Sequence, residues 1–421
     1  MRDCIPIMDK KNVLAVGYIS PGWPLNNFPN GIVAYIENML YGLDDRVNPI
    51  ILTQKLADSE LRNGLIDLSS LTATRGLLEK ILDKILYSLN LPFLSSIQYQ
   101  RDIELRAQNI SLAIKQMNEP LDVLEIEESF GTAHFIMKTT KLPIVTRIHG
   151  PWHIHGPILQ MDGMPDYKLR VFYEGEGIKN SHGVTAPSLD VLNRVREYYD
   201  INLQNAKVIP NPVLEVPIDK QWRYDASNTP FILVVGRFDS HKGGDLAVDA
   251  FRLIALNNKD VKLMFVGPDR GLLVEGKQLK FEEYIARFVP EDNIKKRIQF
   301  LGHCNQALIS NLRKEAIVTI LCSRYETFSI SLAEALAAGS PVVATNVGAI
   351  KELVTDGFNG LLAKPESPDD IADKALSLIS DPVKMQLLSK NAIEDSKKRF
   401  SPEVVAAQAV SYYQSVIGKS T

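Results

Sequence analysis

Short apolar runs alternate along the chain with longer segments in which apolar residues recur at helical spacing. In the first half, the runs predict strands at residues 13–19, 50–53, 123–126, 144–148 and 183–186, and the pattern at 32–43 predicts a helix. In the second half, strands are predicted at 231–235, 263–266, 298–301, 318–321 and 342–344, with helices beginning near Gly243, Gly276, Gln306, Ser329 and Gly348. From residue 368 onward the pattern is helical. Alternating strands and helices indicate α/β domains with doubly wound parallel sheets.

A break in regular structure divides the two halves. Two X-Pro steps in 209–212 are followed by a polar stretch that ends at Pro230, and both features disfavour helices and strands. We therefore expect one domain over residues 1–216 and a second over 217–400, each large enough for its own core. Doubly wound domains bind ligands at the carboxyl ends of their strands, so the site residues should directly follow strands.

Composition and charge narrow the classes of function. The chain has 421 residues, of which 45% are hydrophobic and 23% charged, with a formal net charge of −3. These values fit a globular protein and argue against a protein that coats nucleic acid. No apolar run reaches the roughly 18 residues of a membrane span, and the first ten residues lack the apolar core of a signal peptide. The three unpaired-looking cysteines, Cys4, Cys304 and Cys322, favour reduced thiols in a cytoplasmic protein.

The first candidate motif is the loop 236–244, which follows the predicted strand 231–235. It carries two cations, Arg237 and Lys242, among glycines. A guanidinium offers a planar fork to phosphate oxygens and an ammonium offers a compact charge, so the pair fits a diphosphate. The alternative is a strand-end Arg237 paired with a surface aspartate and an exposed Lys242.

The second candidate motif, residues 324–339, follows the predicted strand 318–321. Glu326 lies in the loop, Phe328, Ser329 and Ile330 open an alanine-rich helix, and Glu334 lies inside it. A helix N-terminus attracts anions, and carboxylates accept hydrogen bonds from vicinal hydroxyls. A diphosphate at this N-terminus would place a sugar near Glu326 and a ribose near Glu334. The alternative is that Glu326 only supplies charge to the helix end and that Glu334 is a surface residue.

The first half offers weaker candidates. A long loop after the first strand ends at Gly31, which could bring a helix N-terminus close to a phosphate, although no dinucleotide fingerprint is present. His149, His153 and His155 follow the strand 144–148. No nearby carboxylate or cysteine completes a metal set, so we expect no metal and favour His149 as a hydrogen-bonding residue. The amphipathic stretch 77–94 favours a helix facing the core and leaves open weak peripheral contact with the inner face of a membrane.

These motifs resemble the retaining, nucleotide-sugar-dependent glycosyltransferases of family 4, also called group 1. The resemblance rests on Gly236-Arg237-x4-Lys242, Glu326-x7-Glu334, the run 335–344, and the segments 348–354 and 356–362. It covers nearly all of the second half in order. In the first half it rests on Gly31, His149 and residues 186–188, with Asn30-Gly31 and His149-Gly150 departing from the usual paired glycines and His-Asp.

The resemblance implies the GT-B fold, in which two Rossmann-like domains face a cleft and a last helix, about 401–421, returns to the first domain. It assigns the donor diphosphate to Arg237 and Lys242, the donor sugar to Glu326, and the ribose to Glu334. Backbone N–H groups of the segment Thr327, Phe328, Ser329 and Ile330 would bind sugar and phosphate. His303 would lie beside the base and His149 beside the reacting sugar.

The resulting hypothesis is a metal-independent enzyme that needs no cofactor and moves a sugar from a nucleoside-diphosphate sugar, expected to be a UDP- or GDP-sugar, to a hydroxyl acceptor. Glu326, His149, Arg237 and Lys242 are the predicted catalytic residues. Two alternatives stay open: a GT-B nucleotide-sugar epimerase or hydrolase, and a non-catalytic sugar-binding scaffold. The acceptor, the oligomeric state and the choice between front-side attack and double displacement are not determined by the sequence.

Overall fold

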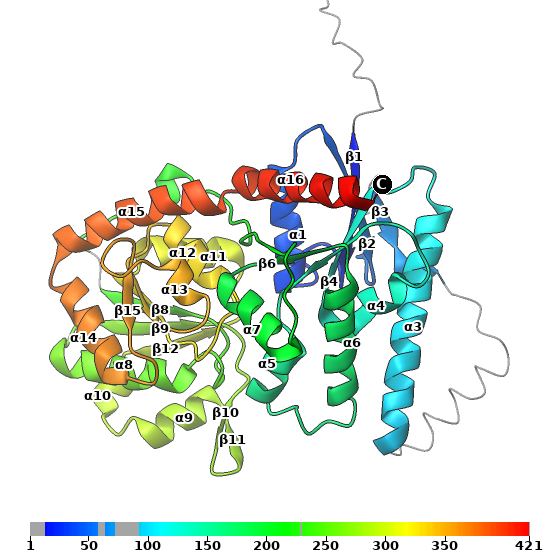
Figure 1. The fold of residues 1–421 in the computed structure, drawn as a ribbon. Helices are drawn as coiled ribbons and strands as arrows, with labels where there is room; N and C mark the ends of the chain where they lie inside the picture. The colour runs from blue at the N-terminus through cyan, green and yellow to red at the C-terminus, as the bar shows by residue number, and fades with distance from the viewer. Residues whose placement is uncertain (1–12, 58–63, 72–91, 228–229, 421) are drawn as a thin grey trace, which may run out of the picture. The chain divides into compact units, whose positions relative to one another are not determined.

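The computed structural model describes residues 13–57, 64–71, 92–227 and 230–420, and it forms two compact units, each built around a parallel sheet (Figure 1). The N-terminal unit contains Met1–Pro187, Leu192–Ile209 and Pro402–Thr421, and the C-terminal unit contains Ser188–Val191 and Pro210–Ser401. Residues 210–216 thus belong to the C-terminal unit, where the Val213 amide donates to the Phe400 carbonyl (2.8 Å). The stretch 77–94 and Cys4 lie almost wholly outside the described residues.

The sheet of the N-terminal unit has the order β3-β2-β1-β4-β5-β6-β7, and its neighbouring strands are parallel. Its strands are β1 (Leu14–Ser20), β2 (Val47–Thr53), β3 (Leu65–Asp67), β4 (Val123–Glu127), β5 (Ile144–Arg147), β6 (Gly183–Ala186) and β7 (Lys207–Val208). Its helices are α1 (Gly31–Gly42), α3 (Pro92–Gln116), α4 (Thr132–Ile136), α5 (Trp152–Ile158), α6 (Tyr167–Asn180), α7 (Leu189–Tyr199), whose first residues belong to the other unit, and α16 (Pro402–Ser420).

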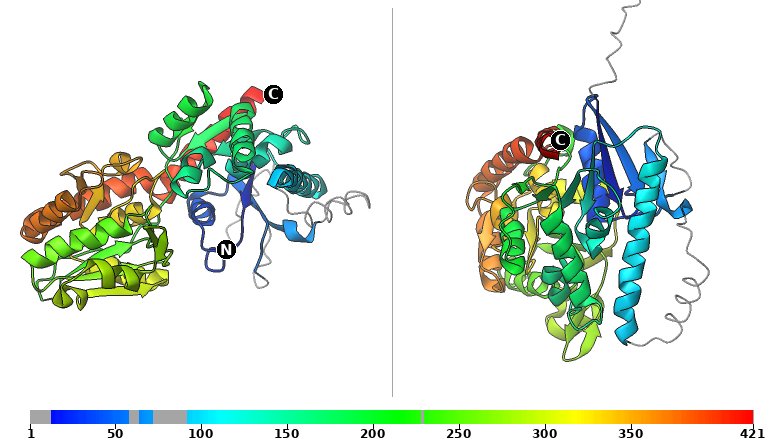
Figure 2. Two further views of the ribbon diagram at one scale, coloured as in Figure 1. Left: turned by 90° about the horizontal axis from the view of Figure 1, so that it is seen from below. Right: turned by 45° about the vertical axis from the view of Figure 1, so that its right-hand side comes forward.

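Alternating side chains on β1 explain the layers of this unit. Val16 and Tyr18 point to one face and pack in a core with α1 and α16, whereas Ala15 and Ile19 point to the other and pack with α3. The period of two along a strand requires this division. Figure 2 (right) shows α3 in cyan and α16 in red on opposite sides of the blue strands. The last helix therefore covers the sheet of the N-terminal unit.

The sheet of the C-terminal unit has the order β12-β9-β8-β13-β14-β15, again with parallel neighbours. Its strands are β8 (Phe231–Val235), β9 (Lys262–Val266), β12 (Ile298–Gly302), β13 (Val318–Leu321), β14 (Val342–Thr345) and β15 (Leu361–Ala363). Its helices are α8 (Gly244–Asn257), α9 (Phe281–Phe288), α10 (Asp292–Lys295), α11 (Gln306–Glu315), α12 (Ile330–Ala337), α13 (Ile350–Leu353), α14 (Pro368–Ile379) and α15 (Pro382–Phe400).

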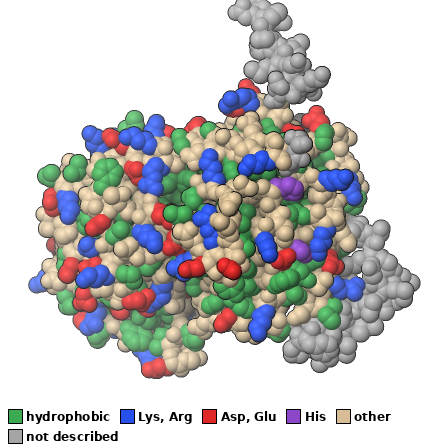
Figure 3. Space-filling view, in the orientation of Figure 1, with side chains coloured by type: hydrophobic (Ala, Val, Ile, Leu, Met, Phe, Trp, Pro, Cys, Tyr) green, Lys and Arg blue, Asp and Glu red, His purple; other side chains and the backbone are tan. Residues whose placement is uncertain are grey.

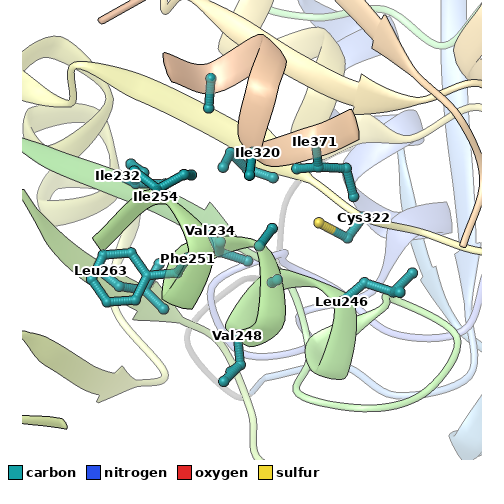
Figure 4. Close-up of a cluster of buried hydrophobic side chains, with 14 of the residues drawn as sticks. Ile232, Val234, Leu246, Val248, Phe251, Ile254, Leu263, Ile320, Cys322 and Ile371 are labelled. Carbon is teal, nitrogen blue, oxygen red and sulfur yellow. The ribbon is translucent and has the colours of Figure 1, made fainter. Parts of the chain in front are cut away.

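The same alternation builds the core of this unit. Ile232 and Val234 on β8 pack with α8 and α14 (Figure 4), while Phe231 and Leu233 pack against α11. The chain leaves β8 toward β9 on one side and later returns through α11 to β13 on the other. The loops after β8 and β13 therefore meet where the winding reverses, which is where doubly wound sheets bind ligands.

The predicted strands are all present, and the differences concern short elements. A hairpin of β10 (Leu272–Val274) and β11 (Lys277–Leu279) was not expected, and the predicted helix start at Gly276 is wrong. Glu275 and Gly276 both have positive φ angles, 50° and 79°, which suit a tight hairpin turn. The helix α9 begins only at Phe281.

The surface carries charges of both signs. Basic and acidic side chains are interspersed on the face drawn in Figure 3, without a region of one sign. Among the described residues, no helix is long and apolar enough to cross a membrane. Cys304 and Cys322 are free thiols.

Candidate active site

Hydrogen bonds join the loop that follows β8 (residues 236–243, the β8 loop) to the loop that follows β13 (residues 322–329, the β13 loop). The Arg324 amide donates to the His241 carbonyl (2.9 Å), and the His241 Nε2 lies 2.7 Å from the Tyr325 carbonyl oxygen. Gly243 has φ +65°, and a Cβ there would overlap the Cys322 carbonyl. A glycine is therefore required for this close approach of the two loops.

Within the β8 loop, Asp239 orients both cations that the sequence singles out. Its Oδ2 accepts from the Arg237 Nε (2.7 Å), and its Oδ1 accepts from the Lys242 backbone amide (2.8 Å). The Arg237 side chain stays 37% exposed. The sequence left open that Arg237 only pairs with an aspartate, and the structure does contain that ion pair with Asp239. The pair leaves guanidinium N–H groups beyond Nε for a ligand.

Lys242 reaches across to the β13 loop instead of pointing into solvent. Its Nζ lies 2.5 Å from the Glu326 Oε1, which also accepts from the Ser323 hydroxyl (2.7 Å). The Glu326 side chain is 8% exposed and that of Lys242 23%. Burial raises the pKa of Glu326, but the Lys242 ammonium and the two hydrogen bonds outweigh it, so the pKa lies below its usual value. Glu326 is therefore ionised at neutral pH.

The backbone of Glu326 is fixed from the next strand. The Ala349 amide donates to the Glu326 carbonyl (2.9 Å), and the preceding Gly348 has φ +47°. A Cβ on Gly348 would overlap the same carbonyl. The turn after β14 thus holds the β13 loop in place, which explains a glycine at that position.

The β13 loop leads into α12 through a residue in an unusual conformation. Ser329 precedes the helix with φ 71° and ψ 82°, and its side chain makes no capping bond to the helix. Such a conformation is uncommon for residues other than glycine and is concentrated at ligand sites. Phe328 is buried, and the Thr327 carbonyl accepts from the Ser188 hydroxyl (2.8 Å). The first turn of α12, starting at Ile330, consequently has no side-chain cap from its N-cap residue.

Glu334, one turn into α12, has a partner that sequence reasoning missed. Arg313 on α11 donates through Nη2 to the Glu334 Oε2 (2.6 Å). The Arg313 side chain is 7% exposed and that of Glu334 26%. Glu334 is therefore not simply an exposed surface residue, because a buried arginine pairs with it. No local pattern around Arg313 distinguishes it from its neighbour Lys314; only the packing of α11 beside α12 does.

His303 is the remaining candidate of the C-terminal unit. It follows β12, which is separated from β8 by β9, and its side chain is exposed. Within the part of the chain that the structure describes, His303 makes no hydrogen bond to Arg237, Lys242 or Glu326. The structure thus brings together Arg237, Lys242 and Glu326. Glu334 lies on the following helix, α12, and its partner Arg313 lies on the preceding helix, α11.

In the N-terminal unit, Gly31 begins α1, and the helix end is already capped. The Asn30 side chain accepts from the Ile32 amide (2.7 Å), which uses one of the free N–H groups of the first turn. Gly31 itself is exposed. A phosphate at this helix end would therefore meet fewer free donors than the sequence motif suggested.

His149 follows β5, and its backbone is held by the buried carboxyl group of Glu128. The Glu128 side chain accepts from the His149 amide (2.9 Å) and the Gly150 amide (2.6 Å). The His149 ring packs edge-on against Tyr35 at 5.1 Å, and the Arg147 guanidinium lies 4.5 Å from the same tyrosine ring. Burial, aided by the Arg147 charge, holds the pKa of His149 well below its usual value, so the imidazole is neutral.

The other two histidines of this segment, His153 and His155, pack against neighbouring residues of the N-terminal unit. The His153 ring stacks on Tyr198 at 4.2 Å, and burial lowers its pKa to about 4. The His155 ring lies beside Gly150. Among the described residues, no group of three His, Cys, Asp or Glu side chains is arranged to hold a metal ion.

Family models match both halves of the chain. Residues 29–214 match the model described as Glycosyltransferase Family 4, and residues 219–395 match that described as Glycosyl transferases group 1. The chain belongs to the group 1 and family 4 glycosyltransferases. The resemblance drawn from the motifs is thereby confirmed.

Curated relatives include glycosyltransferases. The chain is 31% identical to an uncharacterized glycosyltransferase of Methanocaldococcus jannaschii, over 48% of this chain and 52% of that protein. It is 26% identical to N-acetyl-alpha-D-glucosaminyl L-malate synthase of Bacillus anthracis, over 71% of this chain and 76% of that protein. The chain spans about half the length of the first relatives it matches.

Solved structures share this fold. A sucrose-phosphate synthase from Thermosynechococcus elongatus superposes with a TM-score of 0.68 at 17% identity, covering 96% of this chain and all of that one. Anabaena HepE in complex with UDP superposes with a TM-score of 0.65, also at 17% identity, with the same coverage. The glycosyltransferase thus has the expected GT-B fold of two Rossmann-like domains.

Proposed function

We propose that this glycosyltransferase moves a sugar from a nucleoside-diphosphate sugar to a hydroxyl acceptor with retention of anomeric configuration and without a metal ion. UDP- and GDP-sugars are the proposed donors, and the proposed setting is the cytoplasm. Two solved structures of one structural neighbour, Anabaena HepE, carry UDP or UDP-glucose in their titles, which supports a donor of this class.

One observation carries the proposal: the ion pair of Lys242 and Glu326 joins the β8 and β13 loops at the point where the sheet reverses its winding. We assign Lys242 and Arg237 to the donor diphosphate and Glu326 to the sugar hydroxyls. A cation and a carboxylate 2.5 Å apart suit a ligand whose diphosphate and sugar are adjacent. The first turn of α12, which Ser329 does not cap with its side chain, adds N–H groups that favour the same anion.

Charge development explains how these residues would accelerate the reaction. As the bond between the anomeric carbon and the diphosphate oxygen breaks, its electron pair moves to the diphosphate. Two fixed cations and a helix N-terminus stabilise this growing charge, and such preorganised electrostatics is usually the largest catalytic contribution. In the front-side path that we favour, the acceptor oxygen bonds to the same carbon while its proton passes to the leaving oxygen.

The neutral His149 fits a hydrogen-bonding role toward the sugar. An imidazole that stays uncharged can donate from one ring nitrogen without attracting the diphosphate. Glu128 fixes the backbone at His149 and thereby its position. We assign Glu334 to the ribose and His303 to the side of the base, on the family pattern of these positions.

A donor screen tests the proposal. Purified protein is incubated with UDP-, GDP- and ADP-sugars, and release of the nucleoside diphosphate is measured for wild type and Lys242→Met. We expect release from one donor class by wild type and a large loss in the variant. Release with epimerised free sugar as the product would support the epimerase or hydrolase alternative, and absence of release from every donor would support the scaffold.

A further inference from the structure

Arg313 is an unusual residue in the C-terminal unit because it is a cation inside the protein. It lies on α11, and its side chain is only 7% exposed. Arginine is rarely buried unless it is paired, and a buried ion pair often stabilises a fold no better than apolar residues would. The position of Arg313 therefore calls for an explanation beyond stability.

The contacts of Arg313 are directed at one carboxylate. Its Nη2 donates to the Glu334 Oε2 (2.6 Å) and lies 3.4 Å from the Ser331 carbonyl. The Arg313 backbone carbonyl accepts from the Ser340 hydroxyl (2.8 Å), which anchors this end of α11. Within the described part of the chain, the buried Nε of Arg313 makes no hydrogen bond. A pair built only for stability would satisfy that donor too.

The exposure of the two partners shows which side is open. The guanidinium is enclosed, whereas 26% of the Glu334 side chain is exposed. A carboxylate has two oxygens and about four acceptor sites. With Oε2 held from behind by Arg313, Oε1 is left to accept hydrogen bonds from the open side.

We propose that Arg313 is a positioning residue for ribose recognition: it fixes the carboxylate of Glu334 so that the enzyme distinguishes a ribose diol from a sugar without it. This inference rests on the proposed function, in which Glu334 faces the ribose. A glutamate side chain that is free to rotate must lose rotamer entropy on binding. The ion pair removes that cost before the ligand arrives.

The test compares two nucleotides that differ only in the diol. The affinities of UDP and 2′,3′-dideoxy-UDP are measured by calorimetry for wild type, Arg313→Met and Arg313→Lys, with the GDP pair used in their place if UDP does not bind. We expect wild type to bind UDP about 10- to 100-fold more tightly than the dideoxy nucleotide, which is the usual contribution of hydrogen bonds to a charged group. Arg313→Met should reduce the preference to within about threefold, while the affinity for the dideoxy nucleotide stays unchanged.

Matched variants separate positioning from a general loss of structure. Arg252→Met removes another guanidinium of the same unit, which pairs with Glu291, and should leave the preference for UDP at the wild-type value. Arg313→Lys keeps the charge but loses the fork, and should lower the preference at least threefold. If Arg313→Met does not fold, the lysine variant decides.

The outcomes distinguish this inference from the proposed function. If wild type binds none of the UDP, GDP or ADP series, the proposed function is rejected and the inference with it. If wild type binds UDP without preferring the diol, the ribose role of Glu334 and the inference fail while the diphosphate assignment stands. If wild type prefers the diol and both Arg313 variants keep that preference, the inference alone is overturned.

Discussion

Replacing Glu326 by glutamine separates the two ligand-binding tasks of the cluster around Lys242. The Lys242 Nζ contacts the Glu326 Oε1 at 2.5 Å, and the Ser323 hydroxyl contacts the same oxygen at 2.7 Å. A glutamine keeps an oxygen that can accept both hydrogen bonds but removes the negative charge. The variant therefore leaves the shape of the site in place and frees the charge of Lys242 for the diphosphate.

The magnitude follows from the partial burial of the pair. Lys242 is 23% exposed, so solvent screens the attraction and a net value of about 1 kcal/mol is appropriate. If that amount no longer competes with the ligand, the nucleoside diphosphate should bind up to about fivefold more tightly. Turnover of the full donor should fall about 30- to 1000-fold, since a charged contact in the transition state is worth about 2 to 4 kcal/mol.

Calorimetric titration of the nucleoside diphosphate and steady-state kinetics with the donor sugar check both parts. Glu291→Gln is the matched control because Glu291 pairs with Arg252 in the same unit, and it should change neither quantity. If Glu326→Gln weakens the binding of the free nucleotide several-fold, Glu326 contributes to nucleotide binding directly and the division between sugar and diphosphate is wrong.

Four further results are expected. Lys242→Met and Arg237→Met should each fold, by circular dichroism, and lower kcat/KM about 30- to 1000-fold; wild-type kinetics in either would contradict its assignment. Activity should survive EDTA, and complete loss that Mg²⁺ or Mn²⁺ restores would refute metal independence. The profile of kcat/KM against pH should have no limb near 6.5 from His149, because burial and the Arg147 charge hold its pKa well below that value; a limb there that His149→Gln abolishes would contradict its neutrality. Burial, with the nearby Glu174 charge, raises the pKa of Glu128 from 4.5 to about 8. Between these pH values the folded N-terminal unit retains a proton that the unfolded chain loses. The free energy of unfolding should therefore decline as the pH rises from about 4.5 to 8. Urea unfolding at several pH values should show a shallower decline in Glu128→Gln, and an unchanged slope would show that Glu128 does not cause it.

Hydrophobic patterning predicted most strands of the two sheets because each of these strands contains an apolar run. Residues 231–235 and 318–321 coincide with β8 and β13, and the motifs directly after them lie at the reversal of the winding. The edge strands β3, β7 and β15 were not predicted because they are only two or three residues long. The prediction of a helix start at Gly276 was wrong because this glycine lies in the tight turn of a hairpin.

The partners of the candidate residues could not be predicted because they depend on packing between elements. Lys242 and Glu326 are 84 positions apart, and Arg313 and Glu334 lie on different helices. Glu128 had a usable signal: together with Glu125 and Glu127 it lies in or directly after the predicted strand 123–126. Acidic residues at such positions are uncommon without partners, and these bind backbone amides, tyrosine hydroxyls and Arg106.

The most direct test of the central claim follows the anomeric centre of the donor with water as the acceptor, so that no acceptor needs to be known. The α-linked UDP- or GDP-sugar that releases nucleoside diphosphate in the screen is incubated with the enzyme. Proton NMR then records the first sugar formed, before mutarotation. The account predicts the α anomer from wild type and no sugar above background from Lys242→Met. The β anomer as first product, or equal release by the variant, would contradict it.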